Sequence, residues 1–418
     1  MPQSTQESLC YHRNTCRLCE SANVSLVLKL APSPPVDSFI PKSRANEKQE
    51  AFPMDLYLCR DCGHGQLLDV VSPKLLFGDY IYTTASSPGL VNYFRQYAAD
   101  VTRQLKLPSG VLALDIGSND GTLLGFLKET GLRVLGVDPA QNIAGDATSR
   151  GIETLPTFFN SQVAQKIRDE RGPAHLVTAN NVFAHSDALG DMADGVRIML
   201  DADGVFVFEV SYLLDMIENM VFDFIYHEHL SHHSVKPLRL FMQRHGLHVF
   251  AVERTSSKGG TIRCFAQLKG GPRPEQSSVA ELLAYEEQFG LYQLETYERY
   301  TARINREKSK LTNLLAELSS AGKTIAGYGA SATGTVLIHH FELGHAMRFI
   351  VDDNPIRQNR LSPGHHIPIT SSEALAKEKP DYVLILAWRF ADLIMKRNQA
   401  YAAQGGRFII PLPELRVV

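Results

Sequence analysis

The chain lacks the long apolar runs and the excess of positive charge that mark two large classes of protein. None of its apolar runs approaches the roughly 20 residues that a membrane-spanning helix requires, and its N-terminus has no apolar signal-peptide core. Its 42 Lys and Arg residues against 45 Asp and Glu residues give a formal net charge of -3, so no basic field favours a nucleic-acid backbone. We therefore expect a cytoplasmic protein that binds neither membranes nor nucleic acids.

Cysteine is scarce, and its placement is uneven. Five of the six cysteines lie in the first 70 residues. Two C-x-x-C motifs there, at 16–19 and 59–62, each present two thiols on one tight turn, as a tetrahedral Zn2+ site requires. Four unrelated free thiols are the alternative reading. The predicted zinc ligands are Cys16, Cys19, Cys59 and Cys62. Because four thiolates leave no open coordination position, the predicted zinc is structural.

Most of the remaining chain alternates short apolar runs with helical stretches. From about residue 111, the runs VLALDIG, LRVLGVDP, AHLVTANNVF and DGVFVFEV predict the strands of a doubly wound parallel sheet. Residues 275–322 are charged, contain no proline and have helical periodicity. After them, KTIAGYGASATG, MRFIVDDNP and DYVLILAW predict a second Rossmann-like unit. The fold class is therefore α/β: a small N-terminal region that a metal ion holds together is followed along the chain by two Rossmann-like units.

The stretch LALDIGSNDGTLLGFL at 112–127 predicts a strand, a glycine turn and a helix. Such a turn lets a ligand approach the backbone, and the helix N-terminus offers unpaired N–H groups. The spacing of Gly117 and Gly121 is not the G-x-G-x-x-G of dinucleotide folds, and Asp115 at the strand end suits S-adenosylmethionine better than pyrophosphate. Asp138 follows the next predicted strand, where a carboxylate can accept both ribose hydroxyls. An ordinary strand-to-helix turn is the alternative for either motif alone.

The stretch FIYHEHLSHHS at 224–234 holds four histidines, a glutamate and a tyrosine. A zinc protease would need H-E-x-x-H, but Ser231 occupies the place of the second histidine. If YHEH is helical, Tyr226 and His229 share one face, and such a pair beside a methyl donor could transfer protons. A solvated polar helix is the alternative.

Two other stretches bring polar groups to predicted strand ends. Asn180 and His185 in TANNVFAHSD lie where the sheet would face a ligand, although a lone histidine is more often structural. A second glycine turn, IAGYGASATG, precedes Asp353, Arg357 and Arg360, which could meet a nucleotide or a phosphate. A structural Rossmann unit without a ligand is the alternative for this turn.

These motifs, in this order, make the chain resemble the S-adenosylmethionine-dependent sugar C-methyltransferases that methylate C3 of NDP-4-keto-deoxysugars. The likeness covers nearly the whole chain and rests on CRDCGHGQL, DYIYTTASSPG, LDIGSNDGTLL, GVDPA, NNVFAH, FIYHEHLSHHS, KGGTIR, GYGASATGTVLIHH and DDNPIRQNRLSPGHHIPI. It implies a zinc-binding domain at 1–75 and a methyltransferase domain at 76–270. It also implies a helical connection and a C-terminal Rossmann-like domain that binds the nucleotide sugar at 271–418.

The resemblance also implies roles for single residues. His229 matches the base that removes the proton next to the ketone, and Tyr226, Glu228 and His185 match residues around the reacting sugar. The implied contacts to S-adenosylmethionine are Tyr80, Asp115, Gly117, Ser118, Asn119, Asp138 and Asn180. The implied substrate contacts are Lys258, Tyr328, Ala330, Asp353, Arg357 and Arg360. We expect a monomer with one zinc ion and a small-molecule substrate.

The chain departs from the family's pattern in two places. Thr333 and Thr335 follow GYGA where a lysine and often an asparagine are usual, and Lys258 stands where histidine is common before the glycine pair. The threonine in place of lysine removes a positive charge where the substrate's diphosphate is expected to bind. A substrate whose sugar is attached to a different carrier group is therefore an alternative. Methylation of oxygen or nitrogen on another small molecule, and a non-catalytic binding protein of the same fold, are the remaining alternatives.

Overall fold

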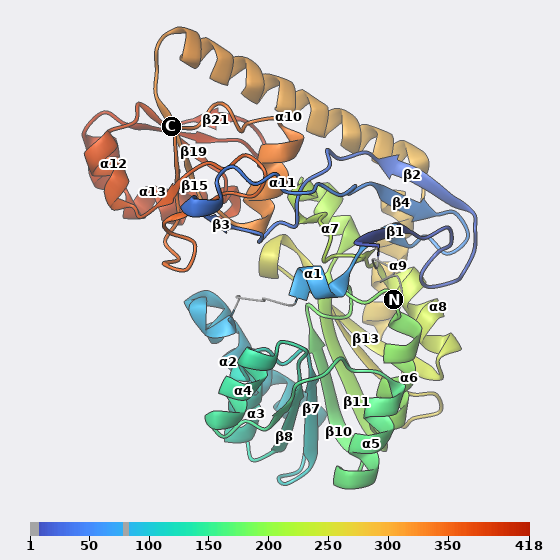
Figure 1. Cartoon of the computed structure of the whole chain (residues 1–418). Coiled ribbons are helices and arrows are strands. Elements are labelled where there is room, and N and C mark those ends of the chain that lie inside the picture. The colour runs from blue at the N-terminus through green and yellow to red at the C-terminus, as the bar shows by residue number, and fades with distance from the viewer. Residues whose placement is uncertain (1–7, 78–82) are drawn as a thin grey trace, which may run out of the picture.

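Three sheet-containing parts follow one another along the chain (Figure 1). The computed structural model describes residues 8–77 and 83–418. The N-terminal part carries the four clustered cysteines, the middle part carries the largest sheet, and the C-terminal part carries a second parallel sheet. The long helix α10 (Leu294–Ser320) runs along the N-terminal and C-terminal parts in Figure 1.

Short antiparallel strands form the N-terminal part, as expected for a small metal-stapled ribbon. Strand β1 pairs with β6, and β2, β4 and β5 form a ladder whose far edge is β12, a strand from much later in the chain. The elements are β1 (Cys10–His12), β2 (Val24–Leu28), β3 (Ile40–Pro41), β4 (Leu56–Cys59), β5 (Gly65–Leu67), β6 (Asp69–Val71), α1 (Pro73–Phe77) and β12 (Ser231–His232).

A seven-stranded sheet of order β13-β14-β11-β10-β7-β8-β9 forms the middle part. Its strands are β7 (Leu112–Ile116), β8 (Arg133–Val137), β9 (Thr154–Leu155), β10 (Ala174–Asn180), β11 (Leu200–Ser211), β13 (Leu247–Thr255) and β14 (Thr261–Leu268). Its helices are α2 (Pro88–Leu105), α3 (Thr122–Glu129), α4 (Gln141–Ser149), α5 (Ser161–Arg171), α6 (Leu189–Met199), α7 (Leu213–Glu218) and α8 (Val235–Arg244).

Both faces of this sheet are covered, because successive strand residues point to opposite sides. Phe206 and Phe208 belong to the apolar cluster that includes α5 and α6, whereas Val205 and Val207 belong to the cluster that includes α2 and α3. The predicted α/β fold with Rossmann-like units is therefore confirmed. The four strands that the sequence predicts, β7, β8, β10 and β11, pair in parallel, and β14, which it did not predict, runs antiparallel to both of its neighbours.

The C-terminal part repeats the Rossmann pattern with order β18-β16-β15-β19-β20-β21, parallel except for β21. Its strands are β15 (Ile325–Tyr328), β16 (Ile350–Val351), β17 (Arg360–Leu361), β18 (Ile369–Thr370), β19 (Tyr382–Ile385), β20 (Arg407–Ile410) and β21 (Arg416–Val417). Its helices are α11 (Ala332–His340), α12 (Glu373–Glu378), α13 (Ala391–Arg397) and α14 (Gln399–Ala403). Before them, α9 (Ser277–Phe289) packs on α8 and β13 of the middle part, and α10 follows it, so the helical periodicity of residues 275–322 is confirmed.

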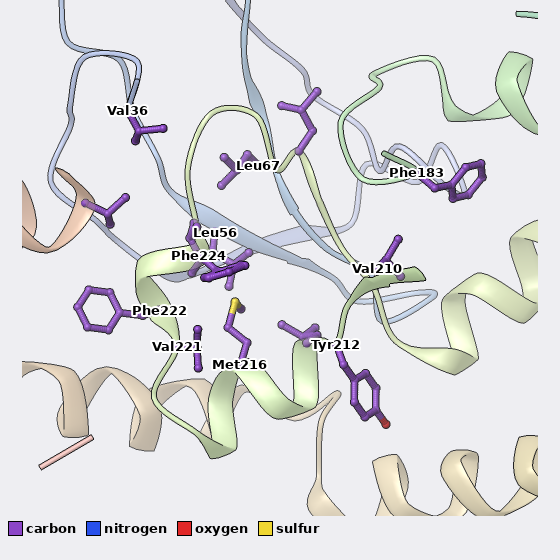
Figure 2. Packing of buried hydrophobic residues seen from close by; sticks show 14 of the residues in the cluster. Val36, Leu56, Leu67, Phe183, Val210, Tyr212, Met216, Val221, Phe222 and Phe224 are labelled. Atoms are coloured by element: carbon purple, nitrogen blue, oxygen red, sulfur yellow. The ribbon is translucent and has the colours of Figure 1, made fainter. Parts of the chain in front are cut away.

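The three parts share strands and one apolar cluster. Strand β12 of the middle part pairs with β5, and β17 of the C-terminal part pairs with β3. Val36, Leu56 and Leu67 of the N-terminal part belong to the same apolar cluster as Met216 and Phe224 of the middle part, and Figure 2 shows Leu56 beside Phe224 and Met216. Because strands cross between parts, the domain limits at 75 and 270 stay a prediction. Among the residues that the structure describes, no helix is both long and apolar enough to cross a bilayer.

Candidate active site

The four cysteines at 16, 19, 59 and 62 converge on one point. The Sγ atoms of Cys16 and Cys62 are 3.6 Å apart, those of Cys19 and Cys59 are 3.5 Å apart, and all four lie within 4.8 Å of one another. Zinc–sulfur bonds of about 2.3 Å in a tetrahedron require sulfur atoms roughly 3.8 Å apart. The four thiols therefore fit a structural zinc ion.

The first glycine turn lies at the carboxyl end of β7 and needs glycine for two reasons. Gly117 has φ +67°, and a Cβ there would come within 2.4 Å of Val182. The turn is held to the next strand by Asp138, whose two carboxylate oxygens accept the backbone N–H groups of Asn119 (2.8 Å) and Ala140 (2.9 Å). The glycine turn and the Asp138 carboxylate therefore lie side by side at the place where the sequence predicts that the methyl donor binds.

Several groups around this turn are buried without a protein partner, as in a site for a polar ligand. Among the described residues, Ser118 Oγ and both side-chain amide atoms of Asn180 are buried and make no hydrogen bond. Asp115 accepts a hydrogen bond from Thr178 (2.6 Å), and burial raises the pKa of its carboxyl to about 7. Buried polar groups normally find a partner, so these atoms fit the amino acid and ribose groups of S-adenosylmethionine. Tyr80, another predicted contact, lies outside the described residues.

The segment that carries His229 is not helical, so the condition under which Tyr226 and His229 would share a helix face is not met, and neither is the alternative of a solvated polar helix. A short 3-10 helix (Phe222–Phe224) leads into a turn in which the His229 N–H donates to the Tyr226 carbonyl (2.8 Å). An i to i+3 turn brings the same two side chains together that a helix would, and their ring centroids are 4.0 Å apart. The predicted pairing of Tyr226 with His229 is present in the structure, by a different backbone route.

His185 reaches the same place from the loop after β10. Its ring centroid is 5.2 Å from that of His229, and it also stacks on Phe77 at 6.1 Å. The Nδ1 atom of His229 is 2.7 Å from the Phe224 carbonyl oxygen. A carbonyl can only accept, so Nδ1 carries the proton and Nε2 keeps its lone pair. The geometry therefore leaves a basic nitrogen on a partly accessible ring.

The protein around these groups fixes their protonation states. Burial lowers the pKa of His229 to about 4, with the Phe224 hydrogen bond opposing and Lys258 adding to the effect. Burial raises the pKa of Glu228 to about 8; Asp37 adds to the rise and Lys258 opposes it. At neutral pH the histidine is an unprotonated base and the glutamate is a neutral acid that can donate a hydrogen bond.

Lys258 provides a positive charge at the same site. Lys258 is an exposed residue, but desolvation by the protein around its ammonium lowers its pKa to about 8; Glu209 opposes this change, Arg389 adds to it and Glu228 opposes it. The residue lines a cavity of about 1050 Å3 between the β13-β14 hairpin and the C-terminal part, together with Arg254, Trp388 and Arg389. Below about pH 8 this lysine is a cation between the two Rossmann-like units.

The second glycine turn, after β15, repeats the arrangement of the first. Asp352 follows β16 and accepts the N–H groups of Ala330 (2.7 Å) and Asn354 (2.8 Å). Tyr328 donates its hydroxyl to Asp353 (2.9 Å). Arg357 lies 3.6 Å from Asp37 and 3.7 Å from Asp352. The structure therefore brings the predicted Tyr328, Ala330, Asp353 and Arg357 to one edge of the C-terminal sheet.

Three polar residues of the C-terminal part have partners in the N-terminal part or in their own helix. Arg360 lies in β17 and donates to the Phe39 carbonyl (3.4 Å). Thr335 is buried and donates its hydroxyl to the Val36 carbonyl (3.1 Å). The Thr333 hydroxyl lies 3.1 Å from that of Ser331, the residue that caps α11. The unusual threonines thus stabilise packing of α11 in this chain.

Two acidic residues near the site were missed in the sequence. Glu209, opposite Asn180 in the β10-β11 ladder, accepts hydrogen bonds from Thr261 (2.9 Å), Arg263 (3.2 Å) and Tyr93. An acid at the end of the apolar run GVFVFEV was the available signal for it. Asp37 comes from a proline-rich loop, and nothing local indicated that its carboxylate would reach Arg357.

Comparison with known proteins assigns the chain to a family. The model "Putative zinc binding domain" matches residues 16–77, "Methyltransferase domain" matches 91–252 and "C-methyltransferase C-terminal domain" matches 256–413. A relative, C-methyltransferase NovU of Streptomyces niveus, is 35% identical over 404 residues, which are 96% of this chain and 96% of NovU. The chain belongs to the C-methyltransferase family. This C-methyltransferase uses S-adenosylmethionine and has a zinc site formed by its four clustered cysteines.

Solved structures match less than half of this chain, and more distantly. Magnesium protoporphyrin IX methyltransferase from Synechocystis PCC 6803, solved with bound SAM, is 16% identical; the match covers 46% of this chain and 88% of that one, with a TM-score of 0.33. The PH0226 protein from Pyrococcus horikoshii OT3 is also 16% identical, with 45% and 95% covered and a TM-score of 0.37. At these TM-scores neither match adds to the assignment.

Proposed function

We propose that this C-methyltransferase adds a methyl group to C3 of an NDP-4-keto-deoxysugar, with His229 as the general base. The observation that carries the proposal is the hydrogen bond from His229 Nδ1–H to the Phe224 carbonyl, which leaves Nε2 unprotonated beside Tyr226 and His185. A C–H bond next to a ketone is acidic enough for such a base, whereas an ordinary sugar carbon is not. Methylation at carbon therefore calls for a keto-sugar.

The first step needs a base and a charge acceptor together. His229 Nε2 takes the C3 proton, and the electron pair of the C–H bond moves into an enolate whose oxygen is the former ketone oxygen. A base with a pKa of about 4 is weak, so this oxygen must be stabilised as its charge develops. The neutral acid Glu228 and the cation Lys258 are groups of the right kind, one to donate a hydrogen bond and one to supply positive charge.

The second step depends mainly on alignment. S-adenosylmethionine, when bound, would supply an electrophilic methyl group: the bond from that carbon to the positively charged sulfur would break as the bond to the enolate carbon forms, and S-adenosylhomocysteine would leave. Asp115, Gly117, Ser118, Asn119, Asp138 and Asn180 are the described residues that we propose hold it. Holding two reactants in line can supply a large part of a rate enhancement without further chemistry. Tyr226 and His185 would complete the wall around the reacting sugar carbon.

We assign the nucleotide half of the substrate to the second glycine turn. Tyr328, Asp353 and Arg357 surround it, and the cavity lined by Lys258 and Arg389 connects this part to the middle part. Arg357, Arg389 and Lys258 offer positive charge for a diphosphate, so the threonines at 333 and 335 do not leave the region without cations. None of the six cysteines, all of which the structure describes, forms a disulfide, which suits action in a reducing cytoplasm.

Replacing His229 tests the proposal directly. We expect His229→Gln to lower the incorporation of labelled methyl into a 4-keto-deoxysugar nucleotide by at least about 100-fold, a loss of roughly 3 kcal/mol of transition-state stabilisation. The same variant should bind S-adenosylhomocysteine with unchanged affinity in calorimetry. Exchange of the C3 proton in heavy water should be lost in parallel, because the base acts before the methyl group is transferred.

His245→Gln is the matched control, since His245 lies after α8 and pairs with Asp194 at 3.1 Å. Its turnover should stay within about 2-fold of wild type. Full methyl transfer by His229→Gln with an intact cofactor site would favour the rival reading, methylation of an oxygen or a nitrogen that needs no carbon acid.

A further inference from the structure

One arginine of the zinc knuckle reaches both loops that carry the proposed catalytic histidines. Arg17 stands between the ligands Cys16 and Cys19, and its side chain has no exposed surface. Long charged side chains are almost never fully buried unless every donor has a partner. The hydrogen-bond acceptors around Arg17 therefore indicate why this charged side chain is buried.

The guanidinium of Arg17 donates in three directions. Its Nε–H donates to the Asp187 carboxylate (2.8 Å), one terminal nitrogen donates to the Leu230 carbonyl (2.9 Å) and the other donates to the Leu67 carbonyl (3.0 Å). Gln66 Oε1 accepts both the Arg17 backbone N–H (2.9 Å) and a side-chain N–H (3.3 Å). Four of the five guanidinium N–H groups thus have an acceptor among the described residues.

Two of these partners adjoin catalytic side chains. Asp187 lies two residues after His185, and Leu230 directly follows His229. Asp187 also accepts hydrogen bonds from Arg13 (3.2 Å) and from the Tyr11 hydroxyl, so its loop is tied to the N-terminal part at several points. The zinc knuckle and the two histidine-bearing segments therefore form one hydrogen-bonded unit.

Further contacts close this unit on its other side. The Ser231 N–H donates to the Ala184 carbonyl (3.1 Å), and Ser231 Oγ lies 3.2 Å from Nε2 of His64, two residues after the ligand Cys62. His233 Nε2–H donates to the Phe183 carbonyl (2.8 Å). Both cysteine knuckles thus reach the segment after His229, and that segment in turn holds the loop that carries His185.

We propose that Arg17 is a positioning residue for methyl transfer, which fixes the separation of His185 and His229 by binding both of their loops to the zinc knuckle. The two rings, 5.2 Å apart by their centroids, come from segments more than 40 residues apart in sequence, and Arg17 is their shared partner. A lysine has a single ammonium and cannot bind three acceptors in one plane, so charge alone does not replace the arginine.

The kinetic test compares Arg17→Lys and Arg17→Gln with Arg13→Gln. Arg13 also pairs with Asp187, but within the part of the chain that the structure describes its side chain makes no hydrogen bond to the segment after His229. We expect both Arg17 variants to keep zinc and cofactor binding and to lose about 100-fold in kcat with little change in KM, as a misplaced base would. Arg13→Gln should stay within about 2-fold of wild type.

A second measurement needs no substrate, because the kinetic test rests on the proposed function. Histidine nitrogen resonances of wild type and Arg17→Lys report the tautomers and pKa values of His185 and His229. We expect shifts at these two rings and unchanged resonances at His245. If wild type fails on keto-sugar nucleotides, the proposed function is wrong, and the resonances still decide the role of Arg17.

Three outcomes would overturn the positioning role. The first is unchanged kcat together with unchanged His185 and His229 resonances in both Arg17 variants. The second is a loss of zinc and of cooperative unfolding in Arg17→Lys as well as in Arg17→Gln, which would make Arg17 a folding residue of the knuckle. The third is an equal loss of kcat in Arg13→Gln, which would assign the effect to the Asp187 loop alone.

Discussion

Accessibility, and not hydrogen bonding, separates His229 from His227 and His233 of the same segment. His227 and His233 each donate to a backbone carbonyl, of Phe52 (3.1 Å) and Phe183 (2.8 Å), as His229 does to that of Phe224. The rings of His227 and His233 are completely buried, whereas the ring of His229 is partly accessible beside Tyr226. The same residue type therefore stabilises the fold at two positions and can meet a substrate at the third.

The alkaline side of the pH–rate profile should report Glu228 and Lys258. Both have a pKa of about 8, so raising the pH removes the donor proton of Glu228 and the charge of Lys258 in the same range. Since both changes weaken enolate stabilisation, we expect kcat/KM to fall through about pH 8. Steady-state rates between about pH 6 and pH 10 measure this limb.

Glu228→Gln separates the two contributions. Glutamine stays a neutral donor at every pH, so the variant should retain a larger share of its own maximal rate at about pH 9 than wild type does. A variant with the same alkaline limb as wild type would show that Glu228 does not titrate in the reaction.

At the scale of secondary-structure elements, the same hydrogen-bonded arrangement of a glycine turn and an acidic residue occurs twice. A strand ends in a glycine turn, and the acid after the neighbouring strand accepts an N–H from that turn and an N–H from its own loop. Asp138 does this for the turn after β7, and Asp352 does it for the turn after β15. In this arrangement the glycine turn and the N-terminus of the following helix lie at the carboxyl ends of the strands. Ligands of doubly wound sheets bind in the crevice there.

Gly117→Ala should weaken binding of S-adenosylhomocysteine by at least about 10-fold in calorimetry. An added Cβ meets Val182 within 2.4 Å while φ is +67°, so the turn must move. Gly110→Ala is the matched control, because Gly110 also has a positive φ (+81°) but would place its Cβ in open space. Gly110→Ala should cost roughly 1 kcal/mol of stability and leave binding unchanged.

Equal binding losses in the two alanine variants would refute this argument. In that case backbone strain anywhere in the middle part would be enough to disturb the site, and the close contact with Val182 would not be the cause. Intact binding in Gly117→Ala would show that the cofactor lies elsewhere.

Local periodicity in the sequence predicted most elements but few of their long-range pairings. Alternating apolar runs located β7, β8, β10 and β11, and charged helical periodicity located α10, because these patterns depend on neighbours within one element. Pairing of β12 with β5, or β17 with β3, joins strands of two or three residues that lie far apart in the chain, and strands so short have no period. For the same reason the partners of Arg17 and Asp37 could not be predicted from the sequence.

At the scale of the whole molecule, the N-terminal part binds the other two together. Its strand β5 pairs with β12 of the middle part, its strand β3 pairs with β17 of the C-terminal part, and Val36 accepts a hydrogen bond from Thr335 of α11. The zinc site therefore stabilises more than its own small sheet. Since the proposed catalytic histidines lie next to these junctions, stability of the junctions and geometry of the site are coupled.

Mild acid should destabilise the protein because histidines are buried uncharged at the junctions. Burial lowers the pKa of His227 and of His233 to about 4, although a hydrogen bond to Phe52 or Phe183 opposes each shift. The unfolded chain, with histidine pKa values near 6.5, binds protons first as the pH falls, so this stability is complete above about pH 6.5 and is lost below it. At about pH 5.5 the loss is roughly 1 kcal/mol for each histidine. Urea unfolding at about pH 7.5 and pH 5.5 measures it.

The double variant His227→Gln/His233→Gln isolates the effect. Glutamine can donate to the same two carbonyls but does not titrate, while all other groups titrate as in wild type. The variant should be less stable than wild type at about pH 7.5, because its side chains fit the histidine sites less well, but its stability should fall by roughly 2 kcal/mol less on going to pH 5.5. An equal fall in both proteins would mean that protons enter elsewhere, and that these two histidines do not set the acid limit of the fold.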